Sequence, residues 1–479
     1  MSDRPRRRVR GGFDSTADNR FTANHYADAS LTDLNSQIYG NRLALVKRCV
    51  YEYRNNTYAK GIVDGFANHI VGRHGPTLQM STGRTVFDQS VEDRWAKYTK
   101  KLDSRGRQNL GAMLRTDIKN TCIRGEALAV KKTAKNAPDN EPRLRVLNIS
   151  PDRIATPMTT DVKNVIDGIQ IDPDTGRPIA YAIYATAQNS TFVSPSEKFE
   201  WERADQVFHF YLDDEAEQVR GYPALQSALP VLAYLRRFTL ATVSAAEQAA
   251  NISAVIYSTL SQVDNELVEA MDEIEIPRNA MLTLPSGWDA RQMEAKHPNA
   301  SYKEFKTELI AEAARCLLMP YLVAAGNAAG YNYSSGRLDM QEMWTTHEIV
   351  QDMLAFTKVD PIFRAWLAEG MLIPGYFKGV TSKLRATPID ELTRSWNWTG
   401  QRHVDPLKEA SAAATRLESN TTTLATEYAK EGKDWEIELE QRIREQAREA
   451  ELRKKYGLEE GGDKPRPNDG PNEGTPNDK

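Results

Sequence analysis

The sequence predicts an α+β fold that is mostly helical and divided into several structural units. Through much of the chain, apolar residues recur at steps of three and four, as they do on one face of a helix. Between residues 143 and 210 the period changes to two, which is typical of half-buried strands. The chain has 479 residues, which is long for a single hydrophobic core, so we expect more than one unit.

The first expected elements are helices. One contains Leu43, Val46, Val50 and Tyr53 on one face, and a second runs from Tyr58 to Gly72. Two more helices are expected around Trp95–Tyr98 and over 110–125.

Strands are expected at 143–149, 168–171, 179–184 and 207–210. The segment 172–176, with Asp172 and Pro173 at its start and Gly176 at its end, is expected to turn the chain between the second and third of these strands.

A pair of long helices with a small unit between them is expected next. Pro223 occupies a favoured first-turn position for a helix that extends to about residue 250. The second helix carries Phe305, Leu309, Ala313 and Leu317 on one face and ends at Met319 and Pro320. The stretch 324–336 is rich in Gly and Asn and is expected to be an exposed, mobile loop before helices resume at 338–372. The last helix is expected from Asp434 to Tyr456.

Composition limits the classes of function. Apolar residues make up 40% and charged residues 27%, which is enough apolar material for a folded protein. The net charge of −4 argues against a protein whose main task is to hold nucleic acid tightly, but it leaves weak DNA contact open. No run of about 18 apolar residues exists, so we expect no membrane partner.

Signatures of catalysis and of metal sites are missing. The chain contains no G-x-x-x-x-G-K-[ST], no G-x-S-x-G and no H-E-x-x-H, so we expect no enzyme activity and no cofactor. Its three cysteines, Cys49, Cys122 and Cys316, form no C-x-x-C pair, which speaks against a zinc site and excludes a disulfide framework. His209 and Cys316 are interpreted as packing residues.

Two aromatic pairs leave alternatives open. Tyr331 and Tyr333, together with Arg337, either contact a nucleic-acid strand or are ordinary residues of a surface loop. Trp396 and Trp398 form either a ligand platform or the packed side of a short strand or turn, and we favour packing.

Four sequence segments, in order along the chain, resemble lambda-type bacteriophage portal proteins. They are Arg54-Asn-Asn-Thr-Tyr-Ala-Lys-Gly-Ile-Val-Asp64 with Ile70-Val-Gly72, then Ala314-Arg-Cys-Leu-Leu-Met-Pro-Tyr321 with Tyr333-Ser-Ser-Gly-Arg337, then Trp398-Thr-Gly400 with Asp405-Pro-Leu-Lys-Glu409, and Glu427-Tyr-Ala-Lys-Glu-Gly-Lys-Asp-Trp435. Asn420 departs from the family pattern, which has Gly there, although Asn also tolerates a left-handed conformation.

The resemblance implies the multi-domain portal fold of wing, stem, clip and crown, assembled as a ring that is commonly dodecameric. Its implied units are the wing at 31–222, stem helices at 223–250 and 301–320, the clip at 251–300, a tunnel loop (324–337) and wing return within 321–400, and a helical crown at 401–456. Composition predicts a flexible basic arm at 1–30 and a disordered tail at 457–479. The basic arm is either a solvated terminus or a tether to a partner.

The implied function is to form the ring at one capsid vertex through which double-stranded DNA is packaged and ejected. Implied partners are the large terminase, the major capsid and scaffolding proteins and a head-completion or tail adaptor, in the virion and, during assembly, in the host cytoplasm. Our hypothesis is that the tunnel loop faces DNA. In it, Asn327, Asn332, Ser334 and Ser335 line the constriction, and Tyr331, Tyr333 or Arg337 contacts DNA transiently. The alternatives are a cytoplasmic enzyme with an unrecognised site and a helical scaffold or adaptor that is not a portal.

Overall fold

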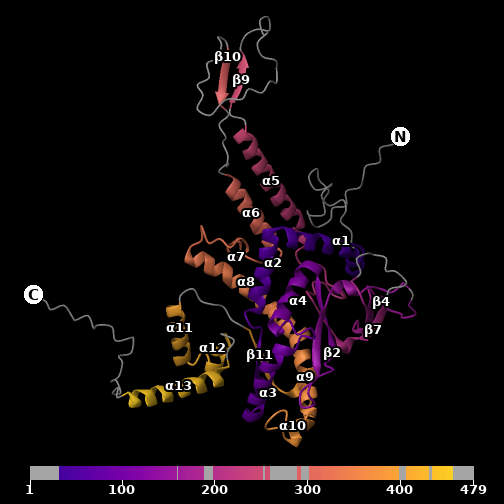
Figure 1. The fold of residues 1–479 in the computed structure, drawn as a ribbon, viewed down its shortest axis with the longest axis vertical. Helices are drawn as coiled ribbons and strands as arrows, with labels where there is room; N and C mark the ends of the chain where they lie inside the picture. The colour runs from indigo at the N-terminus through magenta and orange to yellow at the C-terminus, as the bar shows by residue number, and fades with distance from the viewer. Residues whose placement is uncertain are drawn as a thin grey trace, which may run out of the picture.

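The computed structural model describes residues 32–158, 160–187, 198–251, 254–258, 288–292, 301–398, 406–430 and 434–456. The expected basic arm, the expected tail and most of the expected clip lie outside the described residues. Figure 1 shows a mixed helical and sheet body from which α5 (Leu229–Asn251) and α6 (Ser301–Arg315) project side by side. The rings of Phe238 and Tyr302 stack between these two helices with centroids 5.5 Å apart.

The centre of the body is α2 (Thr57–Val71), which packs against α1 (Leu34–Asn55) and α4 (Leu110–Arg124). Asn56 caps the start of α2, since its side chain accepts hydrogen bonds from the amides of Tyr58 and Ala59. The helix ends at Gly72, whose φ of 66° is easily adopted only without a Cβ atom. These bounds confirm the helix that the sequence predicts.

Two antiparallel sheets form the second layer. The first has the order β3-β2-β8 and the second the order β4-β5-β6-β7. The strands predicted from alternation are confirmed as β3, β5, β6 and β8, and Gly176 has the positive φ expected in the turn between β5 and β6. The bounds are β2 (Glu126–Thr133), β3 (Leu144–Ile149), β4 (Val165–Ile166), β5 (Ile169–Ile171), β6 (Pro178–Tyr184), β7 (Phe199–Arg203) and β8 (Val207–Tyr211).

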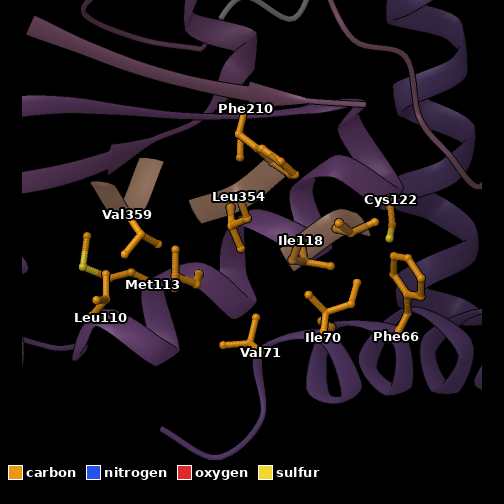
Figure 2. Close-up of a cluster of buried hydrophobic side chains, with 14 of the residues drawn as sticks. Phe66, Ile70, Val71, Leu110, Met113, Ile118, Cys122, Phe210, Leu354 and Val359 are labelled. Atoms are coloured by element: carbon orange, nitrogen blue, oxygen red, sulfur yellow. The ribbon is translucent and has the colours of Figure 1, made fainter. Parts of the chain in front are cut away.

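Strand β2 lies in the middle of its sheet but has no alternating pattern. Its first five residues, 126–130, are all buried, because the helical layer covers one face and the second apolar cluster covers the other. Figure 2 shows how the helical layer packs beneath this sheet. Ile118 and Cys122 of α4 lie between Phe66 and Ile70 of α2 on one side and Phe210 of β8, the strand next to β2, on the other.

An aromatic cluster closes the other end of the body. Trp95 of α3 (Thr85–Tyr98) lies with its ring centroid 5.3 Å from Phe363 and 5.1 Å from Trp366 of α9 (Asp360–Leu372). Trp396 of β11 (Arg394–Asn397), a strand paired with β1 (Thr77–Met80), joins the same cluster. The expectation that Trp396 packs in a short strand is confirmed.

The helix expected to start at Pro223 starts instead at Leu229, after a short 3-10 turn, η5 (Gln226–Ala228). The amides of Ala224 and Leu225 donate to the carbonyls of Thr121 and Cys122, at 3.3 and 3.1 Å. Residues 223–225 therefore cap the end of α4, and the new helix begins only after this contact.

The helix expected to end at Met319 and Pro320 ends at Arg315. Leu318 adopts a left-handed φ of 51°, which breaks the helical path, and Pro320 disfavours helical geometry in the residue before it.

Short helices and a C-terminal helical group complete the fold. The helices predicted over residues 338–372 are confirmed as α8, η6 and α9. The last predicted helix is confirmed as α13. The remaining bounds are η2 (Thr99–Lys101), η3 (Pro151–Arg153), η4 (Ala204–Gln206), β9 (Ala254–Ser258), β10 (Trp288–Gln292), α7 (Tyr321–Ala325), α8 (Tyr333–Leu354), η6 (Ala355–Val359), α10 (Ser382–Ala386), η7 (Ile389–Glu391), α11 (Pro406–Glu418), α12 (Leu424–Lys430) and α13 (Trp435–Lys455).

Candidate functional site

The candidate tunnel segment, residues 326–337, consists of the loop between α7 and α8 and the first turn of α8, near the base of the α5–α6 pair (Figure 1). Both flanking helices pack against α2, and α7 also packs against α6. Residues 326–330 are exposed to solvent. The fold therefore holds an exposed loop between two anchored helix ends.

The loop starts with an ordered turn at the end of α7. Gly326 adopts a left-handed conformation with φ of 61°, and the amide of Asn327 donates to the carbonyl of Leu322 at 3.2 Å. The side-chain oxygen of Asn327 accepts from the amide of Ala329 at 2.9 Å. The side chain of Asn327 thus supports the turn from the solvent side.

The loop is shorter than the sequence predicts, because helix α8 begins at Tyr333. The side chain of Asn332 accepts from the amide of Ser335 at 2.8 Å, and the amide of Asn332 donates to Ser335 Oγ at 3.2 Å. This reciprocal pair is a capping box. Ser334 and Arg337 are exposed on the first turns of α8 and are not part of an irregular loop.

Tyr331 is half-buried at the inner side of the loop. Burial raises the pKa of Tyr331, and the nearby Asp339 carboxylate raises it further. The phenol therefore stays neutral near physiological pH and presents a ring and a hydroxyl without a negative charge.

The segment carries little charge. Between residues 321 and 340 the charged side chains are Arg337 and Asp339. Strong binding of a phosphate backbone needs several Lys or Arg contacts. This surface is therefore suited to weak contact with a phosphate backbone and not to tight binding of one.

All seven predicted contact residues, from Asn327 to Arg337, come together by sequence proximity, on one loop and the first helical turns that follow it. No other part of the chain was predicted to join them.

Histidine and cysteine residues do not form a metal centre in the described part of the chain, where no group of three or more His, Cys, Asp and Glu side chains is placed to hold an ion. His347 of α8 is fully buried against Phe66, His69 and Trp344. Burial, together with His69, lowers the pKa of His347 to about 4. Among the described helices, none is long and apolar enough to cross a membrane.

Sequence reasoning missed a buried ionic network at the junction of the two sheets. Arg220 holds Glu126 with two hydrogen bonds from Nε at 3.0 and 2.9 Å and a third from Nη2. His209 Nε2 lies 2.9 Å from the same carboxylate, and Asp167 bridges Arg220 to Arg42 of α1. Burial disfavours the charged form of Glu126, but Arg220 and His209 outweigh it and hold the pKa of Glu126 below its usual range.

His209 was expected to pack among aromatic residues, and it does contact Tyr181 and Tyr211. Its second role, beside Glu126, carries no signal in the sequence, because 83 residues separate the pair.

The sequence profile of the family described as phage portal protein, lambda family, matches residues 21–351. A curated relative, the probable portal protein of Halomonas phage phiHAP-1, is 24% identical over 430 residues, which cover 84% of this chain and 80% of the relative.

Two solved structures are similar at lower identity. The neck of an empty gene transfer agent particle, computed with C6 symmetry, is 14% identical with a TM-score of 0.45, over 79% of this chain and 89% of the other. An HK97 family phage portal protein from Corynebacterium diphtheriae is 12% identical with a TM-score of 0.29, over 73% of this chain and 93% of the other. Since the family profile covers well over half of the residues, this chain belongs to the lambda family of phage portal proteins.

Proposed function

We propose that copies of this chain form a ring, dodecameric in our proposal, at one capsid vertex of a tailed phage or prophage, and that double-stranded DNA passes through it during packaging and ejection. Membership of the portal family is the observation that carries this proposal. In this assembly the wing is 31–222 with 338–400, the stem is 223–250 with 301–320, the clip is 251–300 and the crown is 401–456. We also propose that residues 1–30 form a flexible basic arm and residues 457–479 a disordered tail.

The channel-facing element is the segment 326–337. Its low charge supports this assignment, because a bore through which DNA slides must contact phosphates without holding them. Asn327 provides a polar side chain among small residues that leave the backbone accessible, and Arg337 provides one positive charge near it. Asn332, Ser334 and Ser335, which are exposed, line the constriction in this proposal, and the capping box between Asn332 and Ser335 holds the base of the loop.

The role is mechanical and not enzymatic in this proposal. The large terminase supplies the energy for packaging, the major capsid and scaffolding proteins surround the ring, and a head-completion or tail adaptor closes it. The protein is then found in the virion and, during assembly, in the host cytoplasm.

Negative-stain electron microscopy with light scattering tests the ring directly. The expected result is a ring with a central opening about as wide as the ~20 Å duplex. A chain that stays monomeric when it is produced together with its capsid and scaffolding proteins contradicts the proposal.

A loop replacement tests the channel assignment. Residues 327–331 are replaced by a Gly-Ser sequence of equal length, which keeps Gly326 and the Asn332 cap. Rings should form normally, while DNA packaging or retention is impaired. The same replacement at residues 135–139, in the loop between β2 and β3, where all but Ala137 are exposed, is the control and should change neither. Normal packaging and retention in the 327–331 variant would refute the assignment.

A further inference from the structure

A basic and apolar groove runs between α1 and α5. It has a volume of about 630 Å³ and is lined by Tyr51 of α1 and by Arg236, Arg237 and Leu240 of α5. Arg236 stands over the ring of Tyr51, with its guanidinium carbon 5.7 Å from the ring centroid. Leu240 is 63% exposed, so a large apolar side chain faces solvent in this groove.

Positive charge concentrates around this groove. Lys47, Arg48 and Arg54 are exposed and lie three or four residues from Tyr51, hence on the same side of α1. With Arg236 and Arg237 they make five cations, against the single carboxylate of Glu52 in the lining. A partner that fits the groove must be apolar and acidic.

The exposed face of α8, continued by Phe356 of η6, has that chemistry. Leu338, Ile349 and Phe356 are 66%, 58% and 82% exposed. At ~100° per residue, these three residues and the acids Glu342 and Asp352 between them fall within about 40° of one line along the helix. Thr345 is the sixth member of this stripe, which contains no basic residue. Within the described residues, neither Glu342 nor Asp352 has an ion-pair partner.

The two surfaces face different sides of one subunit. Helix α2 packs against both α1 and α8 and lies between them, so the groove and the stripe cannot meet within one chain (Figure 1). The groove lining covers residues 233–244 of α5, roughly 17 Å at ~1.5 Å per residue, so it can hold about two thirds of the stripe at 338–356, which extends roughly 27 Å. Two different complementary faces on one chain make a head-to-tail contact, which closes into a ring when the rotation allows.

We propose that the α1–α5 groove of one subunit receives the apolar, acidic stripe of α8 from a second copy of this chain. This inference rests on the proposed ring and names the contact that builds it. Because α8 begins within the candidate tunnel segment, the same helix that carries part of that segment also anchors the neighbouring subunit.

Charge reversal tests this pairing. The groove variant is Arg236→Glu with Arg237→Glu, and the stripe variant is Glu342→Arg with Asp352→Arg. Each should reduce ring formation by ~10-fold or more, because like charges then face each other. All four changes in one chain should restore rings, since opposite charges face each other again. The matched control, Lys383→Glu with Arg385→Glu on exposed α10 at the far end of the body, should assemble like the unchanged chain.

A cross-linking variant tests proximity independently. Leu240→Cys with Ile349→Cys in one chain, treated with a short bifunctional maleimide, should give a ladder of covalent oligomers. Each single variant should give dimers at most. Thermal melting checks that all variants fold.

The outcomes separate the two proposals. If the unchanged chain forms rings and both reversed pairs also form rings, the pairing is wrong and the proposed function stands. If the fourfold variant stays monomeric like each pair, the two faces do not contact each other and the pairing is overturned. Rings in the groove variant together with loss of binding to a short DNA duplex would assign the groove to nucleic acid instead. If the unchanged chain never self-associates, even with capsid and scaffolding proteins, both proposals fail.

Discussion

Lys358 Nζ lies 2.5 Å from Asp117 Oδ2 in the interior of the protein, and both side chains are 1% exposed. Lys358 belongs to the π-helical turn η6, which joins α8 to α9, and Asp117 belongs to α4. Asn148 of β3 accepts a second hydrogen bond from the same ammonium group at 3.0 Å. One charged contact therefore ties together the α8–α9 helix pair, the central helical layer and the sheet.

Breaking this pair on one side should be costly. Lys358→Met leaves the Asp117 carboxylate buried without its cation, and we expect a loss of about 3–5 kcal/mol in the free energy of unfolding. The double variant Lys358→Met with Asp117→Leu should lose much less, because no buried charge remains. Urea unfolding of the unassembled chain, followed by tryptophan fluorescence, measures both. Equal losses in the single and double variants would contradict this explanation.

Gly125 should be intolerant of a side chain. Its φ is 93°, and an added Cβ atom would lie 2.5 Å from the backbone of Tyr222. We expect Gly125→Ala to lower the unfolding free energy by at least about 2 kcal/mol, from the left-handed backbone and the clash together. Gly40→Ala in α1 is the control, since no atom lies within 4 Å of that position, and it should stabilise the helix by about 0.5–1 kcal/mol. A harmless Gly125→Ala would show that the α4–β2 turn adapts easily.

Stability should fall on acidification because of His347. Burial and His69 lower its pKa to about 4, below its value near 6.5 in the unfolded chain. The unfolded state therefore binds the proton more readily between these values, so unfolding becomes easier as the pH falls from about 6.5 towards 4. His347→Phe should flatten this part of the stability profile, whereas the exposed control His74→Gln should not. Unfolding midpoints across this range measure the effect, and an unchanged profile in His347→Phe would refute it.

Ionisation of Glu92 should make the protein less stable as the pH rises, which is opposite to the effect of His347. Burial raises its pKa to about 8, with help from Asp88, Asp434 and Glu436, while the Met80 amide that donates to it at 2.6 Å opposes the rise. The folded state then holds the proton more tightly than the unfolded state, so stability falls as the pH rises from about 4.5 through 8.

Glu92→Gln keeps an acceptor for the Met80 amide but cannot ionise, and the slope attributed to Glu92 should disappear. Thermal melting between pH 6 and pH 9 tests this, with exposed Asp93→Asn of the same helix as the control. The prediction fails if both variants keep the original slope.

Local patterns in the sequence were sufficient for the elements with one buried face. The apolar spacing of α2 and α4 and the alternation of β3 and β8 report one-sided burial directly, and neighbouring residues set it. The resemblance in four ordered segments also placed the chain in its family before any fold was known, and the family profile over residues 21–351 confirms that placement.

Tertiary structure decided the features that depend on distant partners. Strand β2 is buried on both faces and so has no period, and the start of α5 is delayed because residues 223–225 bond to the end of α4. The shorter candidate loop depends on the capping box between Asn332 and Ser335, which competes with the flexible Gly and Asn composition around it. Glu126 and Arg220 are 94 residues apart, and Asp117 and Lys358 are 241 apart, so only packing brings their charges together. Periodicity records which side of an element is buried, whereas the identity of the residue across the contact is a property of the folded chain.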